Sequence, residues 1–325
     1  MQEILSIAAS NLLSPVILFF VLGLAAAFAR SDLSVPEAAA KAMSLYLLFA
    51  IGFKGGVAVS GHGIDLRLVA TLIAGVALSF ALPLLAFGLL RKMTLLSVTD
   101  AAAVAAHYGS ISIVTFVTAT SVLTARGIEF EGYMVAVAAA MEAPAIVSAL
   151  WLVTRGGKAQ TSDGDLWREI LLNGSIVLLV GSFLIGAITG GKGLQEIQSF
   201  IVSPFKGVLC LFLLDMGLIA GRGLRQSRGT MTAPLFVFGM IMPLLGASLG
   251  LLAGLAIGLS TGGVALLMVL SGSASYIAVP AAMRVALPEA NPSIYLTLSL
   301  GVTFPFNLVI GIPLYVALAG ALTGG

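Results

Sequence analysis

Hydrophobic residues fill ten long runs along the chain, and short turns rich in Gly, Pro, Asp or charged residues separate them. Each run is close to the roughly 20 residues that an α-helix needs to cross a bilayer. The runs cover residues 12–30, 36–58, 66–90, 98–124, 131–155, 167–189, 195–221, 231–257, 262–287 and 293–320. The pattern therefore predicts an all-α membrane protein with ten transmembrane helices, numbered 1 to 10 in chain order.

The fourth and ninth runs contain small and hydroxylated residues near their middles, at 109–112 and 271–276. Such residues weaken a helix, because Gly costs backbone entropy and Ser competes for backbone hydrogen bonds. A freed N–H or C=O at mid-membrane is costly unless it faces a cavity or a ligand. Two broken helices at corresponding positions are typical of a secondary transporter's binding site, where they would cross at mid-membrane. The alternative is a pair of small-residue faces for close helix packing.

Positively charged residues predict the orientation, because they are enriched in cytoplasmic loops. With the N-terminus outside, nine Lys or Arg residues fall in inner loops and three in outer loops. The inner ones are Arg30, Arg91, Lys92, Arg155, Lys158, Arg168, Arg222, Arg225 and Arg228, and the outer ones are Arg67, Arg126 and Lys192. Both termini are therefore expected outside. No Lys or Arg precedes Arg30, so we expect the first run to be a membrane helix and not a signal peptide.

Five helices on each side of a polar linker require the second half to be inverted relative to the first. Residues 51–53 in helix 2 correspond to residues 216–218 in helix 7. Residues 109–112 in helix 4 correspond in the same way to residues 272–275 in helix 9. We therefore expect a 5+5 inverted repeat, with residues 1–155 as the first repeat, 156–166 as a short cytoplasmic linker and 167–325 as the second repeat.

The two breaks supply chemistry for both an anion and a cation. N–H groups at a half-helix N-terminus suit an anion, carbonyl oxygens at a half-helix C-terminus suit Na⁺, and serine hydroxyls can serve either ion. The expected anion-binding residues are Gly109, Ser110, Ile111, Ser112, Gly272, Ser273, Ala274 and Ser275. The expected sodium-binding or coupling residues are Ser112, Thr115, Glu142, Ser271, Ser275 and Tyr276.

Composition narrows the classes of protein and site. With 59% hydrophobic and only 9% charged residues, the chain is not a soluble globular protein. The net charge of +2 comes without a basic cluster, so no nucleic-acid partner is expected. A single cysteine, Cys210, cannot form an intrachain disulfide, and two histidines with one cysteine argue against a zinc centre. We expect no cofactor and no metal other than Na⁺.

Ionisable residues inside a membrane segment are functional candidates by default. Glu142, near the middle of helix 5, is either a neighbour of the cation site, a proton carrier, or a packing carboxyl. We expect His107 to be a core histidine rather than a proton carrier. Lys54 and Asp215 would differ by ~20 Å in depth at the helical rise of about 1.5 Å per residue, so we do not pair them, and Asp215 is expected to line an inner vestibule.

The residues at 108–112, 141–145 and 283–295 resemble those of the SbtA-type sodium-dependent bicarbonate transporters, and the resemblance covers nearly the whole chain. It implies a core domain of helices 3–5 and 8–10, a gate domain of helices 1, 2, 6 and 7, and a trimer. It also implies a PII-like regulatory partner. Cyanobacterial members have an Asp at the position of Tyr276 and a longer cytoplasmic linker, so this chain departs from them at both places.

The resulting hypothesis is a sodium-coupled importer of a small anion, with bicarbonate the leading cargo, in the bacterial inner membrane. Its partners are then Na⁺, the anion, lipid and two further copies of the chain. Another small carboxylate, or Na⁺/H⁺ exchange through Glu142, keeps the transporter class. An intramembrane serine hydrolase is the alternative from another class, because Ser273 lies in a GxSx pattern and His107 in an AHxxG pattern. The histidine precedes the serine and ten helices are too many, so we expect no enzyme.

Overall fold

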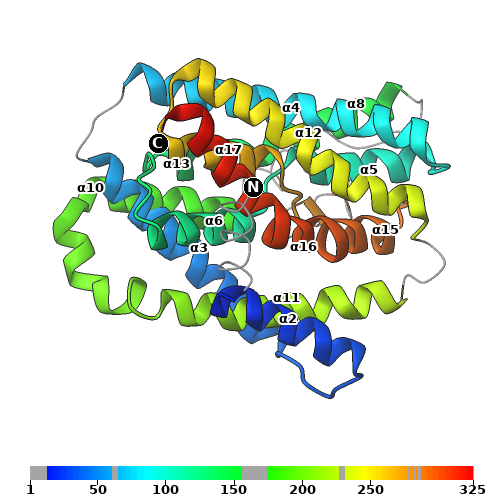
Figure 1. The fold of residues 1–325 in the computed structure, drawn as a ribbon, viewed down its shortest axis with the longest axis horizontal. Coiled ribbons are helices and arrows are strands. Elements are labelled where there is room, and N and C mark those ends of the chain that lie inside the picture. Colours follow the sequence, from blue (N-terminus) through cyan, green and yellow to red (C-terminus); the bar gives the residue numbers. More distant parts are fainter. Residues whose placement is uncertain are drawn as a thin grey trace.

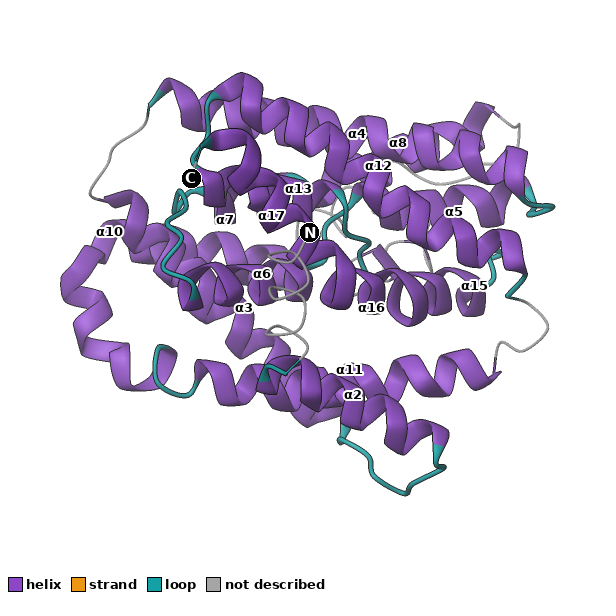
Figure 2. Ribbon diagram, viewed as in Figure 1, coloured by secondary structure: helices purple, strands orange, loops and turns teal. Residues whose placement is uncertain are grey.

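The computed structural model describes residues 13–60, 65–155, 174–226, 231–276, 279–280, 283 and 287–324, and all regular secondary structure in them is helical (Figure 2). The α-helices are α2 (Pro15–Phe28), α3 (Glu37–Ser60), α4 (Leu66–Met93), α5 (Val98–Gly109), α6 (Ile113–Ala125), α7 (Met134–Ala140), α8 (Glu142–Arg155), α10 (Gly174–Ile201), α11 (Phe205–Gln226), α12 (Ala233–Ile257), α13 (Thr261–Ser271), α15 (Pro292–Leu296), α16 (Phe304–Phe306) and α17 (Ile312–Thr323). Two π-helical stretches, η1 (Thr297–Thr303) and η2 (Asn307–Gly311), join α15, α16 and α17 into one run.

Seven helical segments of the described residues are long and apolar enough to cross a membrane. They are Glu37–Ser60, Leu66–Met93, Val98–Ala125, Val177–Ile201, Phe205–Gln226, Ala233–Ile257 and Pro292–Thr323, and α2, α13 and the stretch Met134–Ala149 are shorter apolar helices. The predicted all-helical, multi-pass membrane architecture is therefore confirmed. Most of the second half of helix 9, the whole linker 156–166 and the start of helix 6 lie outside the described residues.

The boundary between helices 6 and 7 was predicted only in part. The sequence placed the end of the sixth run at residue 189 and the start of the seventh at residue 195. In the structure, two helical stretches of α10 meet at a kink at Gly190, whose φ of 58° and ψ of −149° are not helical, so a break is present at the expected position. The second stretch ends at Ile201, however, and the spanning helix α11 begins only at Phe205, directly after Pro204. Gly190 allows the kink because glycine tolerates a positive φ that other residues avoid.

One group of helices consists of α2, α3, α10 and α11, in which α3 packs along α10 and α2 along α11. Glycines let these backbones approach closely. A Cβ on Gly56 would collide with the carbonyl oxygen of Phe183 in α10, and a Cβ on Gly217 would collide with that of Phe20 in α2. Side chains there would force the helices apart, so these two pairs form a closely packed unit.

The other helices form a second group, in which α4 packs on α5, α8 and α12, and α13 packs on α12, α6 and α17. In Figure 1, α4 and α12 run along the upper edge, α2 and α11 along the lower edge, and α6, α13 and α17 lie between them. The interrupted segments therefore lie inside the molecule, where neighbouring helices can contact their exposed backbone groups.

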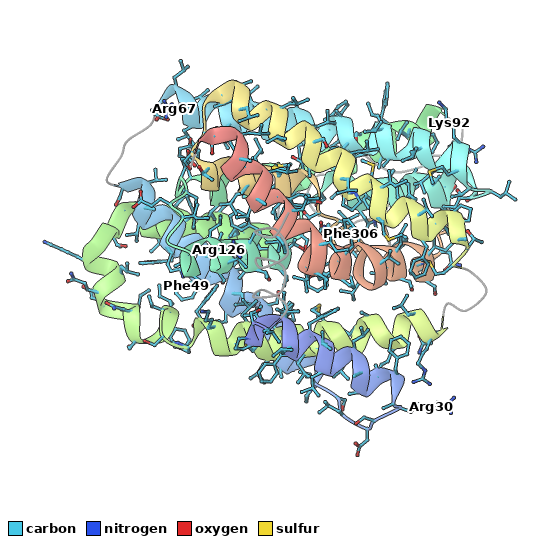
Figure 3. All side chains as sticks on the ribbon, in the orientation of Figure 1. Arg30, Phe49, Arg67, Lys92, Arg126 and Phe306 are labelled. Atoms are coloured by element: carbon cyan, nitrogen blue, oxygen red, sulfur yellow. The ribbon has the colours of Figure 1, made fainter. Side chains whose placement is uncertain are left out.

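Charged side chains mark the two ends of the long helices. Figure 3 shows Arg67 at one end and Lys92 and Arg30 at the other. Near Arg30, the guanidinium groups of Arg222 and Arg225 donate to the carbonyl oxygens of residues 33 and 27, each at 2.7 Å. Arg30, Lys92, Arg222 and Arg225, which the sequence assigned to inner loops, thus share one end of the structure.

Candidate functional site

Helices 4 and 9 are both broken where the sequence predicted. Helix 4 consists of α5 and α6 with residues 110–112 between them, and helix 9 leaves the α-helical conformation after Ser271. The two breaks touch. The backbone N–H of Ser112 donates to Ser273 Oγ at 2.9 Å, and the N–H of Ser275 donates to the carbonyl oxygen of His107 at 2.7 Å. Backbone donors freed by each break therefore find partners in the other.

Each break is positioned by a glycine against a proline-containing helix. A Cβ on Gly109 would collide with the ring of Pro83, which lies inside α4. A Cβ on Gly272 would lie 2.7 Å from the carbonyl oxygen of Pro243, which lies inside α12. Both breaks thus need a glycine for close approach, beside a helix whose ladder a proline already interrupts.

Helix α6 begins directly after the first break, and Ser112 in that break is its N-cap. The Oγ of Ser112 accepts from the N–H of Thr115 at 3.2 Å and from the Thr115 hydroxyl at 2.8 Å. A serine side chain at this position satisfies one of the four N–H groups that a helix start leaves without carbonyl partners. The N–H groups of Ile113 and Val114 in the same turn have no carbonyl partner within α6. This end of α6 can therefore donate hydrogen bonds to an anion.

Glu142 is connected to the first break. The Ser110 hydroxyl donates to Glu142 Oε2 at 2.7 Å, and both side chains are buried. Helix 5 consists of α7 and α8, which are separated only by Met141, and this residue keeps a right-handed helical backbone. The hydroxyl of Ser79 in α4 donates to the carbonyl oxygen of Met141 at 2.5 Å. Pro144 lies in the first turn of α8, a position that proline favours over the middle of a helix.

Two buried hydroxyls beside the second break, those of Ser271 and Tyr276, make no well-formed hydrogen bond with the described residues, although the Tyr276 hydroxyl lies near the Ser112 side chain of the first break. The Tyr276 ring packs edge-on against Phe304, with centroids 5.3 Å apart. Buried polar atoms are costly when unpaired, so these oxygens are suited to a ligand. They lie at residues that the sequence predicted as sodium ligands, beside the C-terminal end of α13.

Asn307 is a site residue that the sequence analysis missed. Its Nδ2 donates to the carbonyl oxygen of Gly272 at 2.8 Å, and its Oδ1 accepts from the hydroxyl of Tyr315 at 3.1 Å. This pair of bonds fixes the backbone of the second break from helix 10. A buried asparagine in an apolar run is the signal that could have revealed it.

His107 does not form a dyad with a serine. Its Nδ1 bonds to the carbonyl oxygen of Ala103 at 2.7 Å, and its ring stacks on Tyr295 with centroids 4.6 Å apart. Its Nε2 has no partner among the described residues, while Ser273 Oγ instead donates to the carbonyl oxygen of Leu270 at 3.1 Å. The arrangement places His107 in the packed core, and its main chain, not its ring, contacts the second break.

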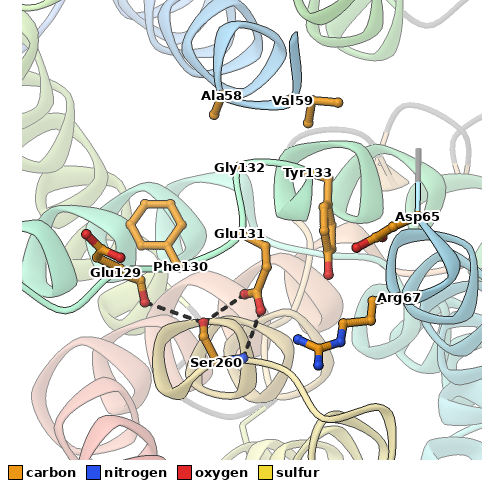
Figure 4. A pocket seen from close by; sticks show the side chains of 10 residues that line it. All are labelled: Ala58, Val59, Asp65, Arg67, Glu129, Phe130, Glu131, Gly132, Tyr133 and Ser260. Carbon is orange, nitrogen blue, oxygen red and sulfur yellow. Dashed lines mark hydrogen bonds between the residues drawn. The ribbon is translucent and has the colours of Figure 1, made fainter. Parts of the chain in front are cut away.

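A polar cavity of about 350 Å³ lies at the end of the molecule that carries Arg67 (Figure 4). Glu131 points across it to Ser260, the N-cap of α13, and accepts from its N–H at 2.8 Å and its hydroxyl at 2.9 Å. Asp65 and Arg67 lie on the side of Glu131 that faces away from Glu129 and Phe130. The described residues contain no group of three or more His, Cys, Asp or Glu side chains that could hold a metal ion.

Comparison with known proteins identifies the family. No curated protein matches the chain in sequence. The family model of the Na⁺-dependent bicarbonate transporter superfamily matches residues 15–320, which include both breaks, Glu142 and Asn307. This is a family of transporters and not of enzymes, so the serine-hydrolase alternative is wrong. The chain is a multi-pass membrane protein that belongs to the Na⁺-dependent bicarbonate transporter superfamily.

Proposed function

We propose that this protein is a sodium-coupled secondary transporter that imports a small anion, with bicarbonate as its main cargo, and that the anion binds where the two breaks cross. The observation that carries the proposal is the direct bond between the breaks, from the Ser112 N–H to Ser273 Oγ. It brings the N-terminus of α6, with its unpaired N–H groups, against the backbone of the second break. These donors suit the oxygens of a small carboxylate-like anion.

The same crossing supports a Na⁺ site. Sodium prefers hard oxygen ligands, and the buried hydroxyls of Ser271 and Tyr276 stand beside the last carbonyls of α13. We assign Ser112, Thr115 and Ser275 to the same ion-binding region, because their polar groups lie at or directly beside the contact between the breaks. The family resemblance puts an Asp at position 276, where this chain has a tyrosine.

Glu142 then becomes the carboxylate most directly connected to the crossing. Its bond from Ser110 links it to the first break, and it stands in the first turn of α8, where a negative charge is favoured by the helix dipole. We propose that Glu142 supplies negative charge for cation coupling in place of the missing aspartate. Na⁺/H⁺ exchange through Glu142 is the second candidate function, and the burial of this carboxyl is the observation that favours it.

The inverted repeat is supported by matching details in the two halves. Ser97 caps α5 and Ser260 caps α13, each through a 3.0 Å bond from a backbone N–H to its hydroxyl oxygen. Each capped half-helix packs on the helix before it and ends at a glycine-containing break. We propose residues 1–155 and 167–325 as the repeats, with α2, α3, α10 and α11 as the gate domain and the remaining helices as the core domain. Alternating access would come from movement of the core against the gate.

For the membrane context we propose an inner-membrane protein with both termini outside. The placement of Arg67 at one end and of Lys92 and Arg30 at the other supports this orientation. The family resemblance supports a homotrimer and a PII-like regulator on the cytoplasmic side.

The proposed function is tested by uptake of labelled bicarbonate into proteoliposomes with and without an inward Na⁺ gradient. Uptake should accumulate bicarbonate only with the Na⁺ gradient, and an equal K⁺ gradient should not replace it. Liposomes without protein control for leak of CO₂. Uptake that is equal with Na⁺ and K⁺ would refute sodium coupling, and Na⁺-driven alkalinisation without bicarbonate would instead favour exchange.

A further inference from the structure

Two adjoining cavities separate the α2, α3 and α11 side of the molecule from α6. The larger, about 560 Å³, lies between α3, α6 and residues 202–206. The smaller, about 480 Å³, lies between α6 and the start of α2 and of α11. Ser121, Ala125 and Lys206 line both, so the two cavities form one space with largely apolar walls and a few cationic side chains, beside the outer half of helix 4.

The charged side chains that line this space are all cationic. Lys54 and Lys206 line the larger cavity, and Arg126 and Lys206 line the smaller one. Neither cavity has an Asp or Glu among the residues of the described chain that line it. Burial lowers the pKa of the Arg126 guanidinium, with no carboxylate acting against that effect. Arginine nevertheless stays protonated, so its charge contributes to a positive potential in the space.

Among the described residues, Lys54 contacts an aromatic ring and no carboxylate. Its Nζ lies 4.3 Å from the centroid of the Phe205 ring, a cation–π contact between α3 and the first residue of α11. An aromatic ring stabilises an ammonium but carries no net negative charge. The acidic residues Glu129 and Glu131 line the cavity of Figure 4, which adjoins the larger cavity at Ala58, Phe130 and Gly132, and Glu131 is bonded there to Ser260. The opposite charges therefore line adjoining cavities, and the cationic side chains line the part beside α6 and α11.

The cationic space leads toward the crossing of the breaks along α6. Phe116 lines the larger cavity and is fully buried. It lies one helical turn after Ser112, a distance of about 6 Å along the axis at the rise of an α-helix. Thr120 and Thr124 continue the same face of α6 into the cavity. The space therefore reaches Phe116, one turn from the proposed binding site.

We propose that these cavities form an anion vestibule, in which Lys54, Lys206 and Arg126 bind small monovalent anions weakly and raise their concentration beside Phe116. The biological role of this vestibule rests on the proposed import of an anion. Its positive potential does not, because that follows from the cationic residues that line it. A cleft with charge of one sign concentrates ions of the opposite sign and speeds their arrival at a buried site. Weak, unpaired cations suit this role, because an anion must leave the vestibule to reach the crossing.

The test measures the potential in the vestibule directly, by the rate at which charged thiol reagents modify a cysteine placed there. Ser121 lines both cavities, so the probe is Ser121→Cys in a Cys210→Ala background, reconstituted in phosphatidylcholine vesicles. An anionic and a cationic methanethiosulfonate are compared, each normalised to its rate with a free thiol in solution. The anionic reagent should react faster, and the difference should shrink as salt screens the lysines.

Removing Lys54 or Lys206 as Lys→Gln should lower the normalised anionic-to-cationic ratio about fourfold each, because a unit charge about 8 Å away in water changes local ion concentrations about twofold in each direction. Lys206 is exposed, so Lys206→Glu preserves folding and should lower the ratio further. The matched control is Lys41→Gln, an exposed lysine at the opposite end of α3, which should leave the ratio unchanged.

A ratio that does not respond to Lys54 and Lys206 would overturn the vestibule, even if Na⁺-driven bicarbonate uptake is found. A ratio that responds in the expected way establishes the vestibule even if uptake of bicarbonate fails, so the two proposals fall separately. Addition of phosphatidylglycerol distinguishes the source of the anion. If this anionic lipid abolishes the charge dependence, a lipid phosphate and not a small anion occupies the space, and the proposal is wrong.

Discussion

Replacing Ser273 with alanine removes one hydroxyl that holds the two breaks together. Ser273 Oγ accepts from the N–H of Ser112 at 2.9 Å and donates to the carbonyl oxygen of Leu270 at 3.1 Å. The side chain is almost fully buried, so water cannot replace it. The substitution leaves the Ser112 N–H without its partner at the place where we propose the anion binds.

The magnitude follows from the two roles of the hydroxyl. Leaving a buried donor unsatisfied costs about 1–3 kcal/mol, so Ser273→Ala should lower the apparent Tm. If the hydroxyl or the backbone that it positions also binds the anion, affinity should fall by about 1 kcal/mol, which is roughly fivefold in KM. A purely packing role predicts the change in Tm without the selective change in KM.

The assay pairs a thermal melt of the purified protein with bicarbonate uptake at fixed Na⁺. Ser148→Ala is the matched control, because Ser148 is also buried but donates only to the carbonyl oxygen of Ala145 in its own helix, at 3.1 Å. Both Tm and KM should stay near wild type in that variant. A Ser273→Ala protein with wild-type Tm and KM would refute the proposed role of the crossing.

Three further predictions address the carboxylate, the topology and the breaks. Glu142→Gln should raise the Na⁺ concentration needed for uptake, since it removes a charge but keeps an oxygen for hydrogen bonding, and an unchanged Na⁺ titration would leave only a packing role. A cysteine at Gly157 in a cysteine-free background should react with an impermeant thiol reagent only from the cytoplasm, and labelling of intact cells would contradict the orientation. Gly109→Ala should lower Tm by an amount that reflects about 1–3 kcal/mol of overpacking against Pro83. Gly88→Ala is the control, because a Cβ at Gly88 meets open space, and its Tm should stay unchanged. Equal Tm values for the two variants would argue against the close approach of Gly109 to Pro83.

The sequence predicts the spanning helices because long apolar runs have few other structures available in a bilayer. It also predicts the breaks, because Gly and Ser inside such runs weaken the helix where no loop is expected. Helix boundaries are harder, since the polar stretch that follows Gly190 is itself helical up to Ile201, and the spanning helix α11 begins only at Phe205. Hydrophobicity alone does not mark where a membrane helix ends.

Contacts between distant segments could not be predicted from one sequence. The bond from Asn307 to the second break joins residues 35 positions apart, and the bond between Ser112 and Ser273 joins residues 161 positions apart. Periodicity says which face a residue occupies, but not which side chain meets it there. The bond from Ser79 to the carbonyl oxygen of Met141, next to Glu142, was missed for the same reason, because it joins two different helices.

The central claim is that Na⁺ and bicarbonate bind together at the crossing, and equilibrium linkage tests it most directly. If they do, each ion must raise the affinity for the other by the same factor. Titration of the purified protein with bicarbonate in Na⁺ and in choline, and with Na⁺ in the presence and absence of bicarbonate, measures both factors. We predict equal factors of about tenfold or more, corresponding to a coupling of at least about 1.4 kcal/mol. A bicarbonate Kd that is the same in Na⁺ and in choline would contradict the account.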